Sequence, residues 1–397
     1  MAPEPYSKPE TLAALLLGRF QAGIAGAGTE VLQVLAARSV RESLIAALRQ
    51  EGHEFTEDRF FAWYAGLDTL SDHSAAYLPP AEAVRPKALS PKALCQAILT
   101  ELRHNSWTSL ATAAATLQQA FMAPEDFNGG ADHEDAHATI AAARQVVEAL
   151  KAGGNGLPFV PVERLFSAAT QSLHFAREDN AIELARGIDR DKGVAIERRG
   201  SGNSRWALDL LAGGYLSPRH GLPIALPLPG LVALPLVTSP LAGFEADEDN
   251  LADHAVVSLH DTLARLDRWL GDAKADVATM RSRLENRRSS GRAQRLAEYL
   301  AGFGPLRGTQ IERVIGVSRP GVRVVTSTLE ASGLVHSQTT RNATRLYLFA
   351  PGFDDALPSP LDRREVHPSS DAIADYEESM RALDELLSRS TFGAGQN

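Results

Sequence analysis

The residues with the most recognisable catalytic spacing are His133, Glu134 and His137, in the stretch HEDAH. On a helix, two histidines four residues apart share one face and can hold a zinc ion, with the glutamate between them as general base. The flanks NGGAD and ATIAAA are not those of a buried catalytic helix, and nothing singles out Glu148 or Glu163 as a third ligand. A zinc hydrolase with His133 and His137 as metal ligands is therefore the alternative hypothesis. We expect a protein without enzymatic activity or cofactor.

The other candidate sites in the sequence are weaker signals of a chemical function. The stretch ERRGSGNSR, residues 197–205, offers glycine and serine N–H groups beside three arginines, which is a combination that can bind phosphate. It lacks the Gly-Lys-Ser/Thr of a P-loop, and a polar hairpin turn accounts for the same residues. The single cysteine, Cys95, excludes an internal disulfide and a cysteine-based zinc site.

Arginine is concentrated in one part of an acidic chain. The 397 residues carry a net charge of −9, yet residues 281–345 contain twelve arginines and only four acidic residues. That segment is therefore +8, which leaves −17 for the remainder. A basic segment attached to an acidic body is typical of a module that binds a polyanion such as nucleic acid.

Residues 308–333 have the pattern of a helix-turn-helix. Gly316 supplies the residue with positive φ that the tight turn needs. Ser318 and Pro320 are typical of the start of the next helix. The apolar residues at the offsets that hold two such helices together are Ile311, Ile315, Val317, Val322 and Val325. Glu312 departs from the pattern, because such motifs usually have a small residue there.

The opposite face of the second helix carries the predicted DNA-contacting residues. These are Arg319, Arg323, Thr326 and Ser327, whose side chains suit base edges and phosphates in a major groove. A predicted hairpin follows, with Val335, Ser337 and Thr339 opposite Thr344, Leu346 and Leu348. Three helices and a hairpin predict a winged helix. The residues expected mainly to bind phosphate are Arg287, Arg288, Arg292, Arg341 and Arg345.

The stretch ENRRSSGRAQRLAEYLAGFGPLRGTQIERVIGVSRPGVRVVTSTLEASGL, residues 285–334, resembles the C-terminal segment of an uncharacterised family of alphaproteobacterial helix-turn-helix proteins, often found on rhizobial plasmids. In that family a long helix ends in Arg-Arg-Ser-Ser before the DNA-binding fold. TLEASGLV also resembles the end of the recognition helix in MarR-like winged helices. The resemblance implies DNA binding, but it says little about residues 1–240.

The elements that must position this module are helical. Alanine and leucine dominate, aromatic residues are only 6%, and apolar residues recur at helical spacing. We predict a mainly α protein with a multi-helical N-terminal body, a long heptad-bearing helix and a C-terminal winged helix-turn-helix. The predicted regions are a helical domain (1–155), a mixed helical and proline-rich connection (156–246), the long helix (247–288), the winged helix-turn-helix (289–352) and an extension with a terminal helix (353–397).

The long helix and the connection each leave two interpretations. Nine apolar residues between Val256 and Leu284 follow steps of three and four. They fit either a dimerising coiled coil or a helix packed on its own domain. Residues 221–244 carry no charge and are long enough to span a membrane, but five prolines favour a buried irregular strap. No secretion signal is recognised, so we expect a cytoplasmic protein without a membrane span.

Together these features predict a sequence-specific DNA-binding protein. Its expected partner is double-stranded DNA, and its expected form is a homodimer. The role expected is that of a bacterial transcriptional regulator or a plasmid-associated DNA-binding factor. For the N-terminal body, two roles are considered: binding an effector or binding a protein partner. A further hypothesis is an interaction scaffold whose winged helix contacts protein.

Overall fold

The chain divides into two units, residues 1–351 and 352–397. The computed structural model describes residues 9–70, 89–124, 129–151, 157–172, 174–175, 185–186, 195–196, 204–217, 219–232, 251–285, 291–339 and 344–352. Side chains are described in all of these except residues 129–132 and two short strands, 185–186 and 195–196.

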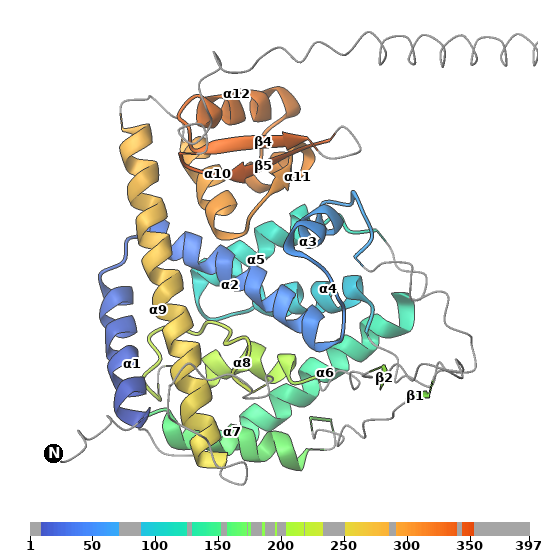
Figure 1. Ribbon diagram of the computed structural model, residues 1–397, viewed down its shortest axis with the longest axis vertical. Coiled ribbons are helices and arrows are strands. Elements are labelled where there is room, and N and C mark those ends of the chain that lie inside the picture. The colour runs from blue at the N-terminus through green and yellow to red at the C-terminus, as the bar shows by residue number, and fades with distance from the viewer. Residues whose placement is uncertain are drawn as a thin grey trace, which may run out of the picture. The chain divides into compact units, whose positions relative to one another are not determined.

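The described part of the chain is mainly helical, as predicted (Figure 1). Its first helices are α1 (Pro9–Ala25), α2 (Thr29–Gln50), α3 (Glu57–Tyr64), α4 (Pro91–Leu102), α5 (Thr108–Ala120), α6 (Gly129–Leu150), α7 (Phe159–Gln171) and α8 (Trp206–Leu216). Strands β1 (Ala185–Arg186) and β2 (Ala195–Ile196) form a short antiparallel pair. The break between α4 and α5 falls where the sequence predicts it, near Asn105, whose side chain accepts the N–H of Trp107 at 2.8 Å.

The aromatic residues of α3 belong to the core. Thr56 caps this helix by accepting the N–H of Arg59 at 3.3 Å. Phe60, Phe61 and Tyr64 lie inside and pack around Phe303, with ring centroids 6.3, 6.0 and 4.7 Å away from it. Because Phe303 comes from the far end of the sequence, this cluster joins the helical body to the C-terminal part of the chain.

The long helix α9 (Leu251–Leu284) is continuous over 34 residues, through Gly271. It runs beside α1 and also contacts α2, α7 and α10 (Figure 1). All nine apolar residues of the heptad stripe are buried inside this one chain. The stripe is therefore the packing face of the helix on its own domain. A coiled-coil dimer through the stripe is wrong, because the same residues cannot also face a second copy.

The C-terminal segment, residues 291–350, consists of α10 (Gly291–Gly302), β3 (Leu306–Arg307), α11 (Gly308–Ile315), α12 (Arg319–Glu330), β4 (Val335–Thr339) and β5 (Arg345–Phe349). The sheet is antiparallel with the order β3-β5-β4. The sequence did not predict β3. The predicted hairpin register is wrong by one residue, since Ser337 lies opposite Tyr347 and not Leu346. A shift of one residue exchanges the two faces of a strand.

The C-terminal segment is packed on the helical body. α10 lies against α2, and α11 lies against α5. Gln310 on α11 is fully buried, and its side-chain amide donates to Ala120 O at 2.9 Å and Tyr64 O at 3.4 Å. Its carbonyl accepts the N–H of Arg307 at 3.0 Å. The side chain of Gln310 thus bonds both sides of the junction.

The proline-rich connection forms an irregular strap over residues 222–232 and passes over α8. Leu228 N donates to Asp209 O at 2.9 Å, and Ser258 Oγ donates to Leu231 O. Residues 233–250, which include the rest of the uncharged stretch, lie outside the described residues. Among the helices described, none combines the length and apolar character that a bilayer span requires.

Candidate nucleic-acid interface

The turn between α11 and α12 has the geometry that the sequence predicts. Gly316 adopts φ 63° and ψ 48°, the left-handed conformation that glycine accepts without strain. The N–H of Val317 then donates to Glu312 O at 3.1 Å. Ser318 is extended and precedes α12, although its side chain makes no capping hydrogen bond, and Pro320 lies in the first turn. The backbone therefore turns at Gly316, and α12 begins three residues later, at Arg319.

Apolar residues hold α11 against α12. Ile311, Ile315, Val322 and Val325 are buried as predicted, and Val317 is partly buried against the same core. Two further residues, Val314 and Leu329, complete the contact. Glu312, which departs from the helix-turn-helix pattern, is half-buried and leaves these residues packed.

The exposed face of α12 differs from the predicted one at two positions, Thr326 and Val324. Arg319, Arg323 and Ser327 are exposed. Thr326 is only 2% exposed, and its hydroxyl lies 3.3 Å from Arg323 O, so its predicted place on the outward face is wrong. Four residues after Val322, Thr326 falls on the buried stripe of the helix. The residue missed by the sequence analysis is Val324, which is 67% exposed.

Several of the arginines expected to bind phosphate can be placed. Arg292 at the start of α10 and Arg345 on β5 are exposed. Arg287, Arg288 and Arg341 lie outside the described residues. Within the part of the chain that the structure describes, no ion pair involves Arg292, Arg319, Arg323 or Arg345. Among the described residues, no acidic side chain therefore neutralises these four charges.

Other arginines of the basic segment serve the protein itself. Arg313 on α11 donates to Gln119 O at 2.9 Å, and Arg307 contacts Met122 Sδ at 3.1 Å. Burial, and then the neighbouring Arg313, lower the pKa of Arg307. Arg281 pairs with Glu30 at 3.2 Å. Fewer arginines are accordingly free to bind a ligand than the net charge of +8 in residues 281–345 suggests.

The histidines of the HEDAH stretch form a pair on α6. The ring centroids of His133 and His137 are 4.6 Å apart. Burial, and then the proximity of His133, lower the pKa of His137, which favours the neutral ring that binds metal. Within the described residues, no third histidine, cysteine, aspartate or glutamate completes a metal site with them. Glu148, one suggested ligand, is bonded to Lys151 instead. The zinc-hydrolase alternative stays a hypothesis.

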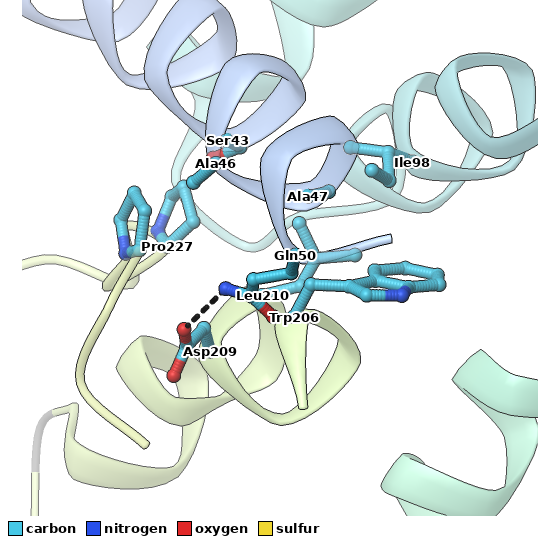
Figure 2. A pocket seen from close by; sticks show the side chains of 10 residues that line it. Ser43, Ala46, Ala47, Gln50, Ile98, Trp206, Asp209, Leu210 and Pro227 are labelled. Atoms are coloured by element: carbon cyan, nitrogen blue, oxygen red, sulfur yellow. Dashed lines mark hydrogen bonds between the residues drawn. The ribbon is translucent and has the colours of Figure 1, made fainter. Parts of the chain in front are cut away.

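A buried polar cluster lies between α2, α4, α8 and the strap (Figure 2). The Asp209 carboxylate accepts the N–H groups of Gly230 and Val232, both at 2.7 Å, and Gln50 approaches it at 3.5 Å. Burial raises the pKa of Asp209 to about 7, while the two N–H groups oppose that rise. The cavity beside it offers about 10 Å³ to the centre of a water molecule, enough for one water. The hydrogen bonds of Asp209 hold the strap against α8. The cavity is too small to bind an effector.

Glu298 on α10 is a buried carboxyl group whose pKa is raised. Burial is the main cause that raises its pKa from 4.5 to about 7; Gln294 opposes the rise and Glu30 adds to it. Between those pH values the folded state holds a proton that the unfolded state releases. Folding stability therefore falls as pH rises through this window.

We expect Glu298→Gln to be more stable than the wild type at about pH 8, by on the order of 2 to 3 kcal/mol, and similar to it near pH 4. Urea unfolding at both pH values measures the difference. Glu285→Gln, at an exposed carboxylate just after α9, is the control and should change neither. Equal stability of Glu298→Gln and the wild type at the higher pH would contradict the raised pKa.

Comparison with known protein families and with curated proteins found no match to this chain. The resemblance to the rhizobial plasmid-type family therefore stays a prediction.

Proposed function

We propose that this protein binds double-stranded DNA through α12, and that its C-terminal segment is a winged helix. The element order α10, β3, α11, α12, β4, β5 and the sheet order β3-β5-β4 support this proposal, because both are those of a winged helix. The observation that carries it is the exposed face of α12. There Arg319 and Arg323 have no acidic partner among the described residues.

The position of these arginines suits a helix that enters a major groove. The groove is about 12 Å wide and admits an α-helix, and the N-terminal residues of a recognition helix contact the base edges. Arg319 is the first residue of α12 and Arg323 follows one turn later. Each can bond a guanine edge with two N–H groups or contact a phosphate. α12 packs on α10, α11 and β4, away from α2 and α5 (Figure 1).

DNA binding by α12 does not require a coiled-coil dimer. The stripe on α9 that suggested it is buried within the chain. A homodimer would need another surface, whereas a single α12 can contact one groove by itself. A transcriptional regulator or a plasmid-associated DNA-binding factor is the biological role that this binding would serve.

We expect Arg319→Ala/Arg323→Ala to weaken binding of the full chain to a random-sequence duplex by about tenfold or more at low salt. The slope of log affinity against log salt should fall by about 2, because two phosphate-binding charges are lost. Fluorescence anisotropy of a labelled duplex measures both quantities.

The matched control is Arg164→Ala/Arg268→Ala, which removes two exposed arginines from α7 and α9. It changes the net charge equally and should leave the slope as it is. If both double variants lose the same affinity, only net charge matters. If the α12 variant loses none, α12 is not the interface.

A further inference from the structure

We infer that Val324 contacts the 5-methyl group of a thymine, and so gives the DNA binding proposed above a preference for a T·A pair. The inference rests on that proposed function and adds a specificity-determining residue to it. Its starting point is the one large apolar side chain that α12 exposes.

Val324 is 67% exposed, and no other large hydrophobic residue of the described C-terminal segment is comparably exposed. The helical repeat places it in an outer stripe, opposite the stripe that packs on α10 and α11. The outer stripe consists of Pro320, Val324, Ser327 and Ala331. Nothing in the packing of α12 explains a valine there, and valine is a weaker helix former than alanine. We therefore infer the binding partner of Val324 from the residues next to it on the exposed face.

Those surroundings favour DNA over protein. Arg319 and Arg323 lie together along one side of the stripe, and a single valine beside two arginines is too small an apolar area for a protein interface. In the major groove, thymine alone presents a methyl group, and small apolar side chains discriminate it by contact. Val324 offers two methyl groups and no hydrogen-bonding group, so thymine is the base it fits.

The neighbouring residue restricts where the thymine lies. Arg323 and Val324 differ by one residue, which is a rise of about 1.5 Å along the helix axis. Successive base pairs are about 3.4 Å apart. The thymine should therefore lie within about two base pairs of the guanine or phosphate that Arg323 contacts.

The test uses a duplex selected by the full-length wild-type chain from a random pool made with thymine. Each thymine is then replaced singly by uracil, which pairs identically and lacks only the methyl group. We expect one position where the replacement weakens wild-type binding by about three- to fivefold, the value of one buried methyl group.

Two variants assign that effect to Val324. Val324→Ala should bind the thymine and uracil duplexes equally at that position, whereas Val324→Ile should keep the preference. Thermal unfolding should show both variants folded, because the position is exposed.

Each outcome decides a different point. A wild type that is insensitive to every uracil replacement, or an alanine variant that keeps the preference, overturns the role of Val324 while DNA binding stands. If the wild type binds every duplex of the pool alike, the role of Val324 fails while DNA binding stands. If it retains no duplex at all, the proposed function fails, and this inference fails with it.

Discussion

Gly213→Ala should be among the most destabilising single-methyl changes in this protein. Gly213 lies on α8 beneath the strap, and a Cβ atom there would overlap the backbone carbonyl of Leu226. The strap cannot move aside easily, because it is held by backbone N–H groups on both sides of this contact. After it, those of Leu228, Gly230 and Val232 are bonded to Asp209, and before it, that of Leu222 is bonded to Leu216 O. We expect the free energy of unfolding to fall by about 3 kcal/mol or more.

The adjacent glycine provides a matched control. Gly214 is on the same helix and exposed, and no atom lies within 4 Å of its Cβ position. Gly214→Ala should therefore stabilise the protein by about 0.5 to 1 kcal/mol through helix propensity. Urea unfolding followed by circular dichroism compares the two variants. Equal shifts in the same direction would mean that the strap does not press on α8.

Gln310→Glu should have the second large effect, at the junction between α11 and the helical body. The amide nitrogen of Gln310 is buried and donates to two backbone carbonyls, at Tyr64 and Ala120. An ionised glutamate would place an acceptor oxygen against both carbonyl oxygens. A protonated glutamate would have one O–H group, which can donate to only one of them. We expect a loss of about 3 to 5 kcal/mol, because an uncompensated polar group or charge would be buried.

Two comparisons separate charge from lost hydrogen bonds. Gln310→Met keeps the approximate volume and should cost less, about 2 to 3 kcal/mol, since it leaves buried carbonyls unpaired without adding charge. Thr309→Ala, at the exposed neighbouring position, should change stability by less than about 0.5 kcal/mol. A Gln310→Glu variant as stable as Thr309→Ala would show that α11 does not depend on this junction.

Local patterns predicted the turn and the helix breaks well. Gly316 in its left-handed conformation and the buried offsets around it follow from rules that act within one or two turns. The break near Asn105 is of the same kind. Such features depend on neighbouring residues only, so one sequence contains enough information for them.

The residue pattern did not predict the exposed face of α12 or the strand register of the C-terminal sheet correctly. Thr326 was placed outward because its hydroxyl suits DNA, although its spacing from Val322 puts it on the buried stripe. Weighing that spacing before the chemistry would have identified Val324 instead. The two-residue strand β3 was missed because so short a segment has no period of its own.

Long-range contacts could not be predicted from the residue pattern. The stripe on α9 looks the same whether it faces a second chain or helices α1 and α7. Likewise, Arg307 and Arg313 are indistinguishable in sequence from arginines that bind phosphate, yet they contact residues nearly two hundred positions away. Their partners depend on how distant helices come together.

The most direct measurement is the affinity of the full-length chain for a labelled random-sequence duplex at about 50 mM salt, by fluorescence anisotropy. If α12 is a DNA-binding helix, the wild type should bind with a dissociation constant at or below about 10 µM and weaken steeply as salt is added. The Arg319→Ala/Arg323→Ala variant should bind clearly less tightly under the same conditions. No detectable binding by the wild type at that salt concentration would contradict the DNA-binding function.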